Sequence, residues 1–325
     1  MILISGATGI VGHFIAQLLL SKGYKLRALK RENSNTSKLG VHPNLEWFEA
    51  EVGDIDSLKK AFDGIEYVVH CAAIVSFHQK DKEQMFEVNI AGTANMVNMA
   101  LDNNIKKFVH ISSVAALGRK EGQEVINENA KWEESKYNSN YAKSKHLGEL
   151  EVWRGQEEGL NGVILNPSIV LGPGDWNTSS MHIFKYVNQG RLFYPSGDLN
   201  FVDVRDVADI VCEMLFNDIA GERYILNSGT EPYKKTLELI SKYLNKPAPR
   251  YKVSYALLNF AYVIDMIRSF ITAQKSILTK ESLMLSKMSF FYSNEKIIRE
   301  LDYKFRDLEE AVSWTCNELK NSSIP

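Results

Sequence analysis

Cysteine and excess charge of either sign are both scarce in this sequence of 325 residues. The three cysteines, Cys71, Cys212 and Cys316, lie far apart, and none belongs to a Cys-x-x-Cys or Cys/His cluster. This spacing argues against a disulfide scaffold or a structural metal site and suits a reducing compartment. With 38 basic and 40 acidic residues, the net charge of −2 provides no basic field that would attract nucleic acid or anionic lipid.

Long apolar runs are also missing. No uncharged stretch reaches the ~18 residues that a membrane-spanning helix needs. The nearest candidate, residues 255–273, contains Asp265 and Arg268. It fits a helix packed on the fold, a lid over an apolar substrate, or a contact with a membrane surface. Because an apolar run begins at Ile2, no room remains before it for a signal peptide. We therefore expect a cytoplasmic protein with no integral membrane segment.

The first half of the chain alternates short apolar runs with helical patterns. Such alternation predicts an α/β fold, a Rossmann-type doubly wound parallel sheet with helices on both faces. The rhythm changes after Gly172, which divides the chain into a predicted Rossmann domain (1–172) and a smaller, mostly helical substrate-binding region (173–325). We expect the chain to cross back to the first domain around 200–230. The expected strands are 2–5, 25–29, 45–49, 67–71, 108–111, 162–165 and 223–226, and the expected helices are 11–22, 57–62, 82–103, 140–158 and 307–320.

A glycine-rich turn joins the first expected strand to the first expected helix. Gly6 permits a tight turn, Gly9 lets backbone N–H groups approach a pyrophosphate, and Gly12 brings the helix close to the sheet. The helix N-terminus then faces the anion. Since the turn lies between a strand and a helix, we interpret it as a dinucleotide site. Thr8 and Ile10 complete the turn.

The end of the second expected strand bears on the choice of nucleotide. Sites for NAD usually place an acidic residue there, which bonds to the ribose 2′-hydroxyl. This sequence has Lys30 and Arg31 instead. A guanidinium can pair bidentately with a 2′-phosphate, so NADP(H) is favoured and NAD(H) stays an alternative.

Three residues form a candidate catalytic group. Tyr141 and Lys145 are four positions apart on one face of an expected helix. Ser113 follows an apolar strand at the end where α/β sheets bind ligands. A nearby ammonium can lower the pKa of a tyrosine by roughly 1–3 units from its usual value near ~10, which suits Tyr141 to acid–base chemistry. Ser113 would hold the oxygen of the substrate.

These motifs together resemble the extended short-chain dehydrogenases/reductases of the NAD-dependent epimerase/dehydratase superfamily, and most closely the dihydroflavonol-4-reductase-like branch. The resemblance covers nearly the whole chain, and the Gly6–Gly12 turn and the Tyr141-x-x-x-Lys145 pair carry it. It implies that Ser113, Tyr141 and Lys145 are catalytic and that Arg31 reads the 2′-phosphate. It also implies cofactor contacts at Asp54, Ile55, Cys71, Ala72, Ala73, Asn89, Tyr141, Lys145, Pro167, Ser168 and Val170.

One departure from the resemblance concerns the substrate. Related nucleotide-sugar epimerases carry an Arg-Asp pair, whose arginine binds the diphosphate, where this chain has Leu199-Asn200. A small, largely apolar or neutral carbonyl compound thus becomes the favoured substrate, although Arg191 or Lys185 could replace the missing arginine. Candidate pocket residues are Phe77, His78, Ser113, Trp176 and Phe184.

The sequence thus predicts an NADPH-dependent oxidoreductase that interconverts a carbonyl and an alcohol, with Tyr141 as acid or base. One alternative is an NAD-dependent sugar epimerase or dehydratase with internal redox chemistry. A second is a non-catalytic NADP(H)-binding sensor or partner protein. A homodimer is compatible with the resemblance.

Overall fold

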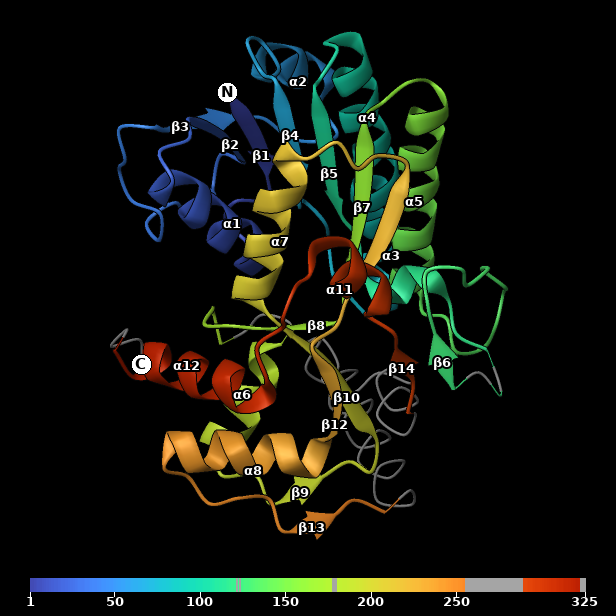
Figure 1. Ribbon diagram of the computed structural model, residues 1–325. Coiled ribbons are helices and arrows are strands. Elements are labelled where there is room, and N and C mark those ends of the chain that lie inside the picture. The colour runs from blue at the N-terminus through green and yellow to red at the C-terminus, as the bar shows by residue number, and fades with distance from the viewer. Residues whose placement is uncertain (121, 123, 177–179, 255–288, 322–325) are drawn as a thin grey trace.

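The computed structural model of the chain describes residues 1–120, 122, 124–176, 180–254 and 289–321 (Figure 1). Its central sheet has seven strands, all parallel, in the order β11-β7-β5-β4-β1-β2-β3. The predicted Rossmann-type fold is confirmed, and the strand boundaries differ from those expected by at most two residues. The strands are β1 (Ile2–Ser5), β2 (Leu26–Lys30), β3 (Leu45–Glu49), β4 (Tyr67–His70), β5 (Lys107–Ile111), β7 (Gly162–Pro167) and β11 (Glu222–Leu226).

Helices cover both faces of this sheet, which explains why its central strands are apolar without alternation. All five residues of β5 are buried. One face packs against α1 (Ile10–Ser21) and α7 (Val204–Phe216). The other face packs against α2 (Ile55–Ala61), α4 (Gly92–Asp102) and α5 (Asn140–Glu157). Each face therefore has its own apolar core, and the strand ends are left to carry polar side chains.

The segment expected as one helix over 82–103 is interrupted. It comprises α3 (Lys82–Phe86), a π-helical turn (Glu87–Ala91) and α4. The turn contains Asn89, whose side chain bonds to both backbone groups of Ile74. Periodicity did not predict the interruption, because one wide turn leaves the apolar spacing of the flanking helices nearly unchanged.

The rest of the chain forms a smaller layer below the sheet in Figure 1. Its apolar core lies among three helices and a three-stranded sheet, in which β10 pairs parallel to β8 and antiparallel to β12. The elements are β8 (Ile169–Leu171), α6 (Met181–Asn188), β10 (Asp198–Asp203), β12 (Gly229–Pro232), α8 (Tyr233–Leu244) and α12 (Leu308–Asn321). The remaining elements are 3-10 helices Gln79–Asp81 and Val114–Leu117, the strand pairs β6 (Val125–Ile126) with β14 (Phe291–Tyr292) and β9 (Phe193–Tyr194) with β13 (Tyr251–Lys252), and α11 (Glu295–Leu301).

Three further expectations from the sequence concern the C-terminal helix, residues 255–273 and membrane-spanning segments. The helix expected over 307–320 begins with a capping box, in which Asp307 and Glu310 accept hydrogen bonds from each other's backbone N–H groups. The interpretations offered for residues 255–273 fall outside the described residues. Among the described helices, none has the length and apolar character needed to cross a membrane.

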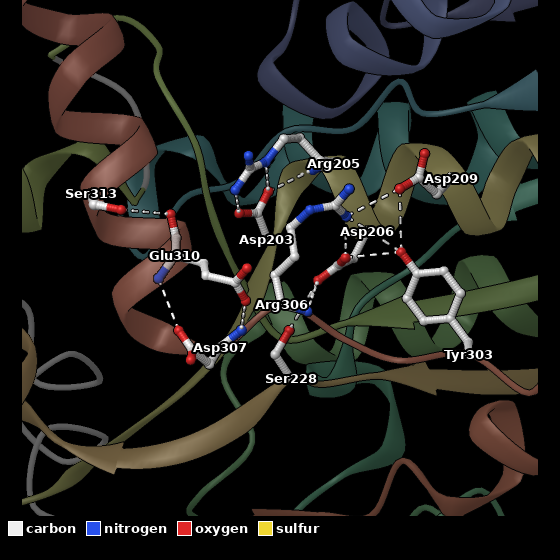
Figure 2. A network of polar contacts seen from close by, with 10 residues as sticks. All are labelled: Asp203, Arg205, Asp206, Asp209, Ser228, Tyr303, Arg306, Asp307, Glu310 and Ser313. Atoms are coloured by element: carbon white, nitrogen blue, oxygen red, sulfur yellow. Dashed lines mark hydrogen bonds and ion pairs between the residues drawn. The ribbon is translucent and has the colours of Figure 1, made fainter.

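A polar network fastens the C-terminal segment to α7 (Figure 2). Asp206 on α7 is fully buried, and it accepts hydrogen bonds from Tyr303 and Arg306. The Arg306 guanidinium also pairs with Asp209, one turn away on α7, at 3.0 Å. Burial raises the pKa of Asp206, and Tyr303 and Arg306 oppose that shift. The buried carboxylate therefore depends on partners that come from the segment preceding α12.

We predict that Arg306→Ala destabilises the fold by about 2–3 kcal/mol, because it leaves a buried charge without its cation. Urea denaturation followed by circular dichroism would measure the change. Lys304→Ala, which removes an exposed cation from the same segment, is the matched control and should unfold like the wild type. Equal midpoints for the two variants would contradict this assignment.

Candidate active site

The predicted site residues gather at one edge of the central sheet. Because all seven strands are parallel, their carboxyl ends meet at that edge, where α/β folds bind ligands. The glycine turn follows β1, the Cys71–Ala73 turn follows β4, and Ser113 follows β5. Helix α5 brings Tyr141 and Lys145 to the same edge. Sequence positions more than a hundred residues apart are thereby combined in one site.

The glycine turn has the shape that a pyrophosphate requires. Gly6 has a φ of +72°, and a Cβ there would lie 2.8 Å from the backbone nitrogen of Ala72. A Cβ on Gly12 would collide with the carbonyl oxygen of Gly6. Helix α1 begins after Gly9 with no side-chain cap and no acidic residue in its first turn, so its N-terminal N–H groups stay available to an anion. Thr8 and Gly9 are exposed beside them, and Ile10 is partly so. These features fit a dinucleotide.

The turn after β4 is bonded directly to the end of β1. The Ser5 hydroxyl accepts hydrogen bonds from the backbone N–H groups of Cys71 and Ala72, at 3.2 and 3.1 Å. It also lies 2.7 Å from Nδ1 of the buried His70. Asn89 holds the next residue of the turn, Ile74, as described above. The candidate cofactor residues Cys71, Ala72 and Ala73 thus lie against the glycine turn, and Asn89 (1% exposed) supports them from below.

At the end of β2 the two candidate cations differ. Lys30 forms an ion pair with Glu49 on β3, at 3.2 Å. Arg31 is exposed, and no carboxylate of a described residue pairs with its guanidinium. Arg31 is therefore the freer of the two to meet a 2′-phosphate.

Asp54 and Ile55 lie at the start of α2. Asp54 caps the helix by accepting from the backbone N–H of Asp56, and a hydrogen bond with Ser57 is the largest of the causes that lower its pKa. Both residues are exposed. Their exposure leaves them accessible to a nucleotide.

Ser113, Tyr141 and Lys145 come together as the sequence predicted. Ser113 caps the 3-10 helix Val114–Leu117, and its hydroxyl lies close enough to the Tyr141 phenol to lower the pKa of that phenol. Ser139 caps α5 by accepting from the N–H of Ala142 at 3.0 Å, which fixes the start of the helix directly before Tyr141. Lys145 is 2% exposed, and its ammonium donates to the Ile111 carbonyl at 2.9 Å.

Burial dominates the acid–base behaviour of this group. It raises the pKa of Tyr141, against which the nearby Ser113 hydroxyl and the positive charge of Arg119 act. It lowers the pKa of Lys145 to about 8, against which the negative charge of Glu149 acts. Sequence reasoning attributed the tuning of Tyr141 to Lys145. The cation that acts on the phenol here is Arg119, which the sequence did not single out.

The candidate substrate residues are distributed unevenly. The Phe77 ring lies edge-on to Tyr141, with ring centroids 6.2 Å apart. His78 precedes the 3-10 helix Gln79–Asp81, and its side chain is half-buried. Trp176 packs partly buried against the apolar core of the smaller layer, and Phe184 lies fully buried within that core. Its position makes Phe184 a packing residue, so Phe77 is the aromatic residue best placed to face a substrate.

The segment after β7 carries the last expected cofactor contacts. Pro167 is buried, Ser168 is nearly so, and Val170 is partly exposed on β8. The Ser168 hydroxyl is buried without a partner among the described residues. An unsatisfied buried hydroxyl of this kind costs free energy unless a ligand or water bonds to it. Ser168 lies two residues after Asn166, which bonds to the Ser113 carbonyl, and this position fits a contact with the carboxamide end of a dinucleotide.

Sequence reasoning missed a buried polar network behind the catalytic group. Glu149 on α5 bonds to Ser112 and Asn166, and Asn166 bonds to the carbonyl of Ser113. Glu149 follows Lys145 by four residues, so helical spacing from the Tyr141/Lys145 pair could have found it.

The sequence profile of the "NAD dependent epimerase/dehydratase family" matches residues 2–229. The chain belongs to this family. Several similar proteins carry reductase names. It is 29% identical to a protein of Synechocystis sp. named "Putative dihydroflavonol 4-reductase", over 98% of this chain and 94% of that protein. It is 28% identical to cinnamoyl-CoA reductase 1 of Petunia hybrida, over 75% of this chain and 77% of that protein.

Among solved structures, the crystal structure of gox2253 is similar over almost the whole length. The two chains share 30% identity with a TM-score of 0.84, covering 99% of this chain and 98% of the other. The resemblance to the dihydroflavonol-4-reductase-like branch is confirmed. The protein is an NAD(P)-dependent oxidoreductase of the extended short-chain dehydrogenase/reductase type, and it uses a nicotinamide dinucleotide.

Gly6→Ala is expected to weaken NADPH binding by at least ~10-fold, because its Cβ would push the Cys71–Ala73 turn away from the pyrophosphate position. Gly64→Ala is the matched control: Gly64 has a φ of +70°, and a Cβ there meets nothing within 4 Å. Both variants lose roughly 1–2 kcal/mol of stability to left-handed backbone strain. Fluorescence titration with NADPH should separate them, and equal affinities would show that the close approach at Gly6 does not matter for binding.

Proposed function

We propose that the protein is an NADPH-dependent reductase of a small, largely apolar aldehyde or ketone, which it converts reversibly to the alcohol. The observation that carries the proposal is the neighbouring Ser113–Tyr141 pair, with the buried Lys145 one turn away, at the sheet edge that also holds the glycine turn. The reductase names of the relatives support the same reaction class.

Ser113, Tyr141 and Lys145 would each have a separate role in the reaction. The hydroxyl groups of Ser113 and Tyr141 would donate hydrogen bonds to the carbonyl oxygen of the substrate and orient its carbon. The bound nicotinamide would supply the hydride. Tyr141 would transfer its phenolic proton to the oxygen as negative charge develops there, and in the oxidative direction it would take that proton back. The Lys145 ammonium, held by the Ile111 carbonyl, would bond to the ribose of the cofactor, and the positive charge of Arg119 would stabilise the phenolate.

The preference for a neutral substrate is supported by the residues that replace the diphosphate-binding pair of epimerases. Leu199 is fully buried in the apolar core of the smaller layer. Asn200 is engaged with the carbonyl of Phe290 and the hydroxyl of Thr230. Neither offers a positive charge. Arg191 bonds to Gln189 and is exposed, so it is one remaining candidate for a replacement.

Two rival functions stay open to experiment. An NAD-dependent sugar epimerase or dehydratase with internal redox chemistry is compatible with the family. It predicts a nucleotide that cannot be removed from the purified protein and proves to be NAD. A non-catalytic NADP(H)-binding protein predicts binding without turnover of any carbonyl compound.

Tyr141→Phe should lower turnover of an aldehyde, ketone or sterol substrate by about 10²–10⁴-fold, since it removes the proton donor and keeps the ring. NADPH consumption followed by absorbance would measure it. Tyr243→Phe removes a phenol that bonds to Glu309 on the far surface and serves as the control. Activity of the Tyr141 variant within threefold of the control would remove Tyr141 from the mechanism.

Arg31→Ala should weaken NADPH binding about 10–100-fold, the loss of roughly 1.5–3 kcal/mol from one phosphate pair, and leave NADH binding unchanged. Lys25→Ala removes an exposed cation just before the opposite end of β2 and should alter neither affinity. Titration of the wild type, Arg31→Ala and Lys25→Ala with NADPH and NADH at fixed salt would measure these affinities. An equal loss for NADPH and NADH would mean that Arg31 does not read the 2′-phosphate.

A further inference from the structure

Glu149 is a buried carboxylate that the proposed reaction does not use. It lies on α5 one helical turn after Lys145 and is 1% exposed. Its Oε1 atom accepts a hydrogen bond from the Ser112 hydroxyl and another from Nδ2 of Asn166, each at 2.5 Å. Its Oε2 atom lies 3.4 Å from Nη1 of Arg223 on β11. One side chain on the helix therefore contacts groups on β7 and β11 and the residue that follows β5.

These bonds lead directly to the backbone of Ser113. Nδ2 of Asn166 on β7 donates its second hydrogen to the Ser113 carbonyl at 2.8 Å. Ser112 precedes Ser113, and its backbone N–H donates to Leu165 on β7 at 2.8 Å. The carboxylate is thus one hydrogen bond from Ser112 and two from Ser113. Without the carboxylate, the Ser112 hydroxyl would lose its acceptor, and Asn166, which holds the Ser113 carbonyl, would lose a partner. The Ser113 hydroxyl would then be less firmly positioned.

The same carboxylate also acts on Lys145, because its negative charge raises the pKa of the ammonium. The groups that face the ammonium are His70 on β4, Cys71 after it, His110 on β5 and Glu149 on its own helix. Burial lowers the pKa of both histidines, to about 3 for His70, and raises that of Cys71 to about 12, so these three stay neutral. Glu149 is the group in this set that can carry a negative charge.

We propose that Glu149 is a positioning residue, whose ionised carboxylate keeps Lys145 charged and at the same time holds Ser113 in place through Ser112 and Asn166. The proposal rests on the proposed function for the roles of Ser113 and Lys145. Ionisation is supported by the partners themselves. Nδ2 of Asn166, Nη1 of Arg223 and the Ser112 hydroxyl all donate to the carboxylate, and these bonds oppose the burial that raises the pKa of Glu149.

Two substitutions separate charge from shape. Glu149→Gln keeps the length of the side chain and removes the charge, whereas Glu149→Asp keeps the charge and shortens the reach. Glu151→Gln is the matched control, because Glu151 lies on the same helix in a half-exposed ion pair with Arg154. Melting curves establish that each variant folds. The NADPH dissociation constant and kcat/KM are then measured against pH, over a range on both sides of the Lys145 pKa of about 8.

The sign of the expected shift follows from the lysine. Affinity for NADPH falls as pH rises through the pKa of Lys145, since the ammonium loses its proton. Without the negative charge of Glu149 that pKa drops further, so the midpoint in Glu149→Gln moves to lower pH by about one unit. In Glu149→Asp the midpoint stays near the wild-type value, while kcat falls about 10-fold because the shorter side chain no longer holds Ser112 and Asn166.

Each outcome bears on the proposal. A midpoint in Glu149→Gln that coincides with those of the wild type and Glu151→Gln would overturn it. If neither Glu149 variant folds, Ser112→Ala tests the hydrogen-bonded arm. It should lower kcat about 10-fold with an unchanged NADPH midpoint, and an unchanged kcat would refute the proposal. If the wild-type protein reduces no carbonyl compound, the proposed reductase function is wrong. A shifted midpoint of NADPH binding in Glu149→Gln would still support the proposed effect of Glu149 on Lys145.

Discussion

The buried ammonium of Lys145 is the constraint on which the candidate site depends. Taking an ion out of water costs several kcal/mol unless hydrogen bonds and opposite charge compensate. The Ile111 carbonyl at the end of β5 supplies a hydrogen bond, and Glu149 supplies charge. The neighbouring His70 and His110 stay neutral, so they add no repulsion to the ammonium. The ammonium is therefore placed by the end of one particular strand and by one particular turn of α5.

Close packing of α5 makes that placement possible. A Cβ on Gly148 would lie 2.5 Å from the carbonyl oxygen of Asn89, so the helix and the π-helical turn touch through backbone alone. The Asn89 side chain then reaches Ser144 on α5 and Ile74 in the turn after β4. One asparagine in a widened turn thus connects the catalytic helix to the cofactor turn. The π-helical turn thus places Asn89 where its side chain can bond to both segments. Such turns occur frequently at functional sites.

Sequence reasoning predicted the parts of this arrangement that depend on local spacing. The strand before Gly6, the helix after it and the Tyr141/Lys145 pair each follow from a short pattern, and the parallel sheet follows from their alternation. Glu149 lies at helical spacing from Lys145, but its bond to Asn166 on another strand is not visible in the local pattern. Arg119 was missed because its importance comes from neighbours distant in sequence, such as Tyr292. Phe184 was offered as a pocket residue, yet it completes an apolar core, since aromatic spacing alone does not distinguish a core from a pocket.

Arg119 shows how the smaller layer takes part in the electrostatics of the site. Its backbone N–H donates to Asn138 at 2.8 Å, and its Nε atom donates to the Tyr292 hydroxyl at 2.8 Å. The guanidinium also lies over the rings of Phe290 and Tyr292, which hold it by cation–π contacts. Because β14 contributes Tyr292 and pairs with β6, the cation that favours the ionised form of Tyr141 is fixed by residues near the far end of the chain. The acidity of the candidate proton donor is therefore a property of both layers, although all three candidate catalytic residues come from the first.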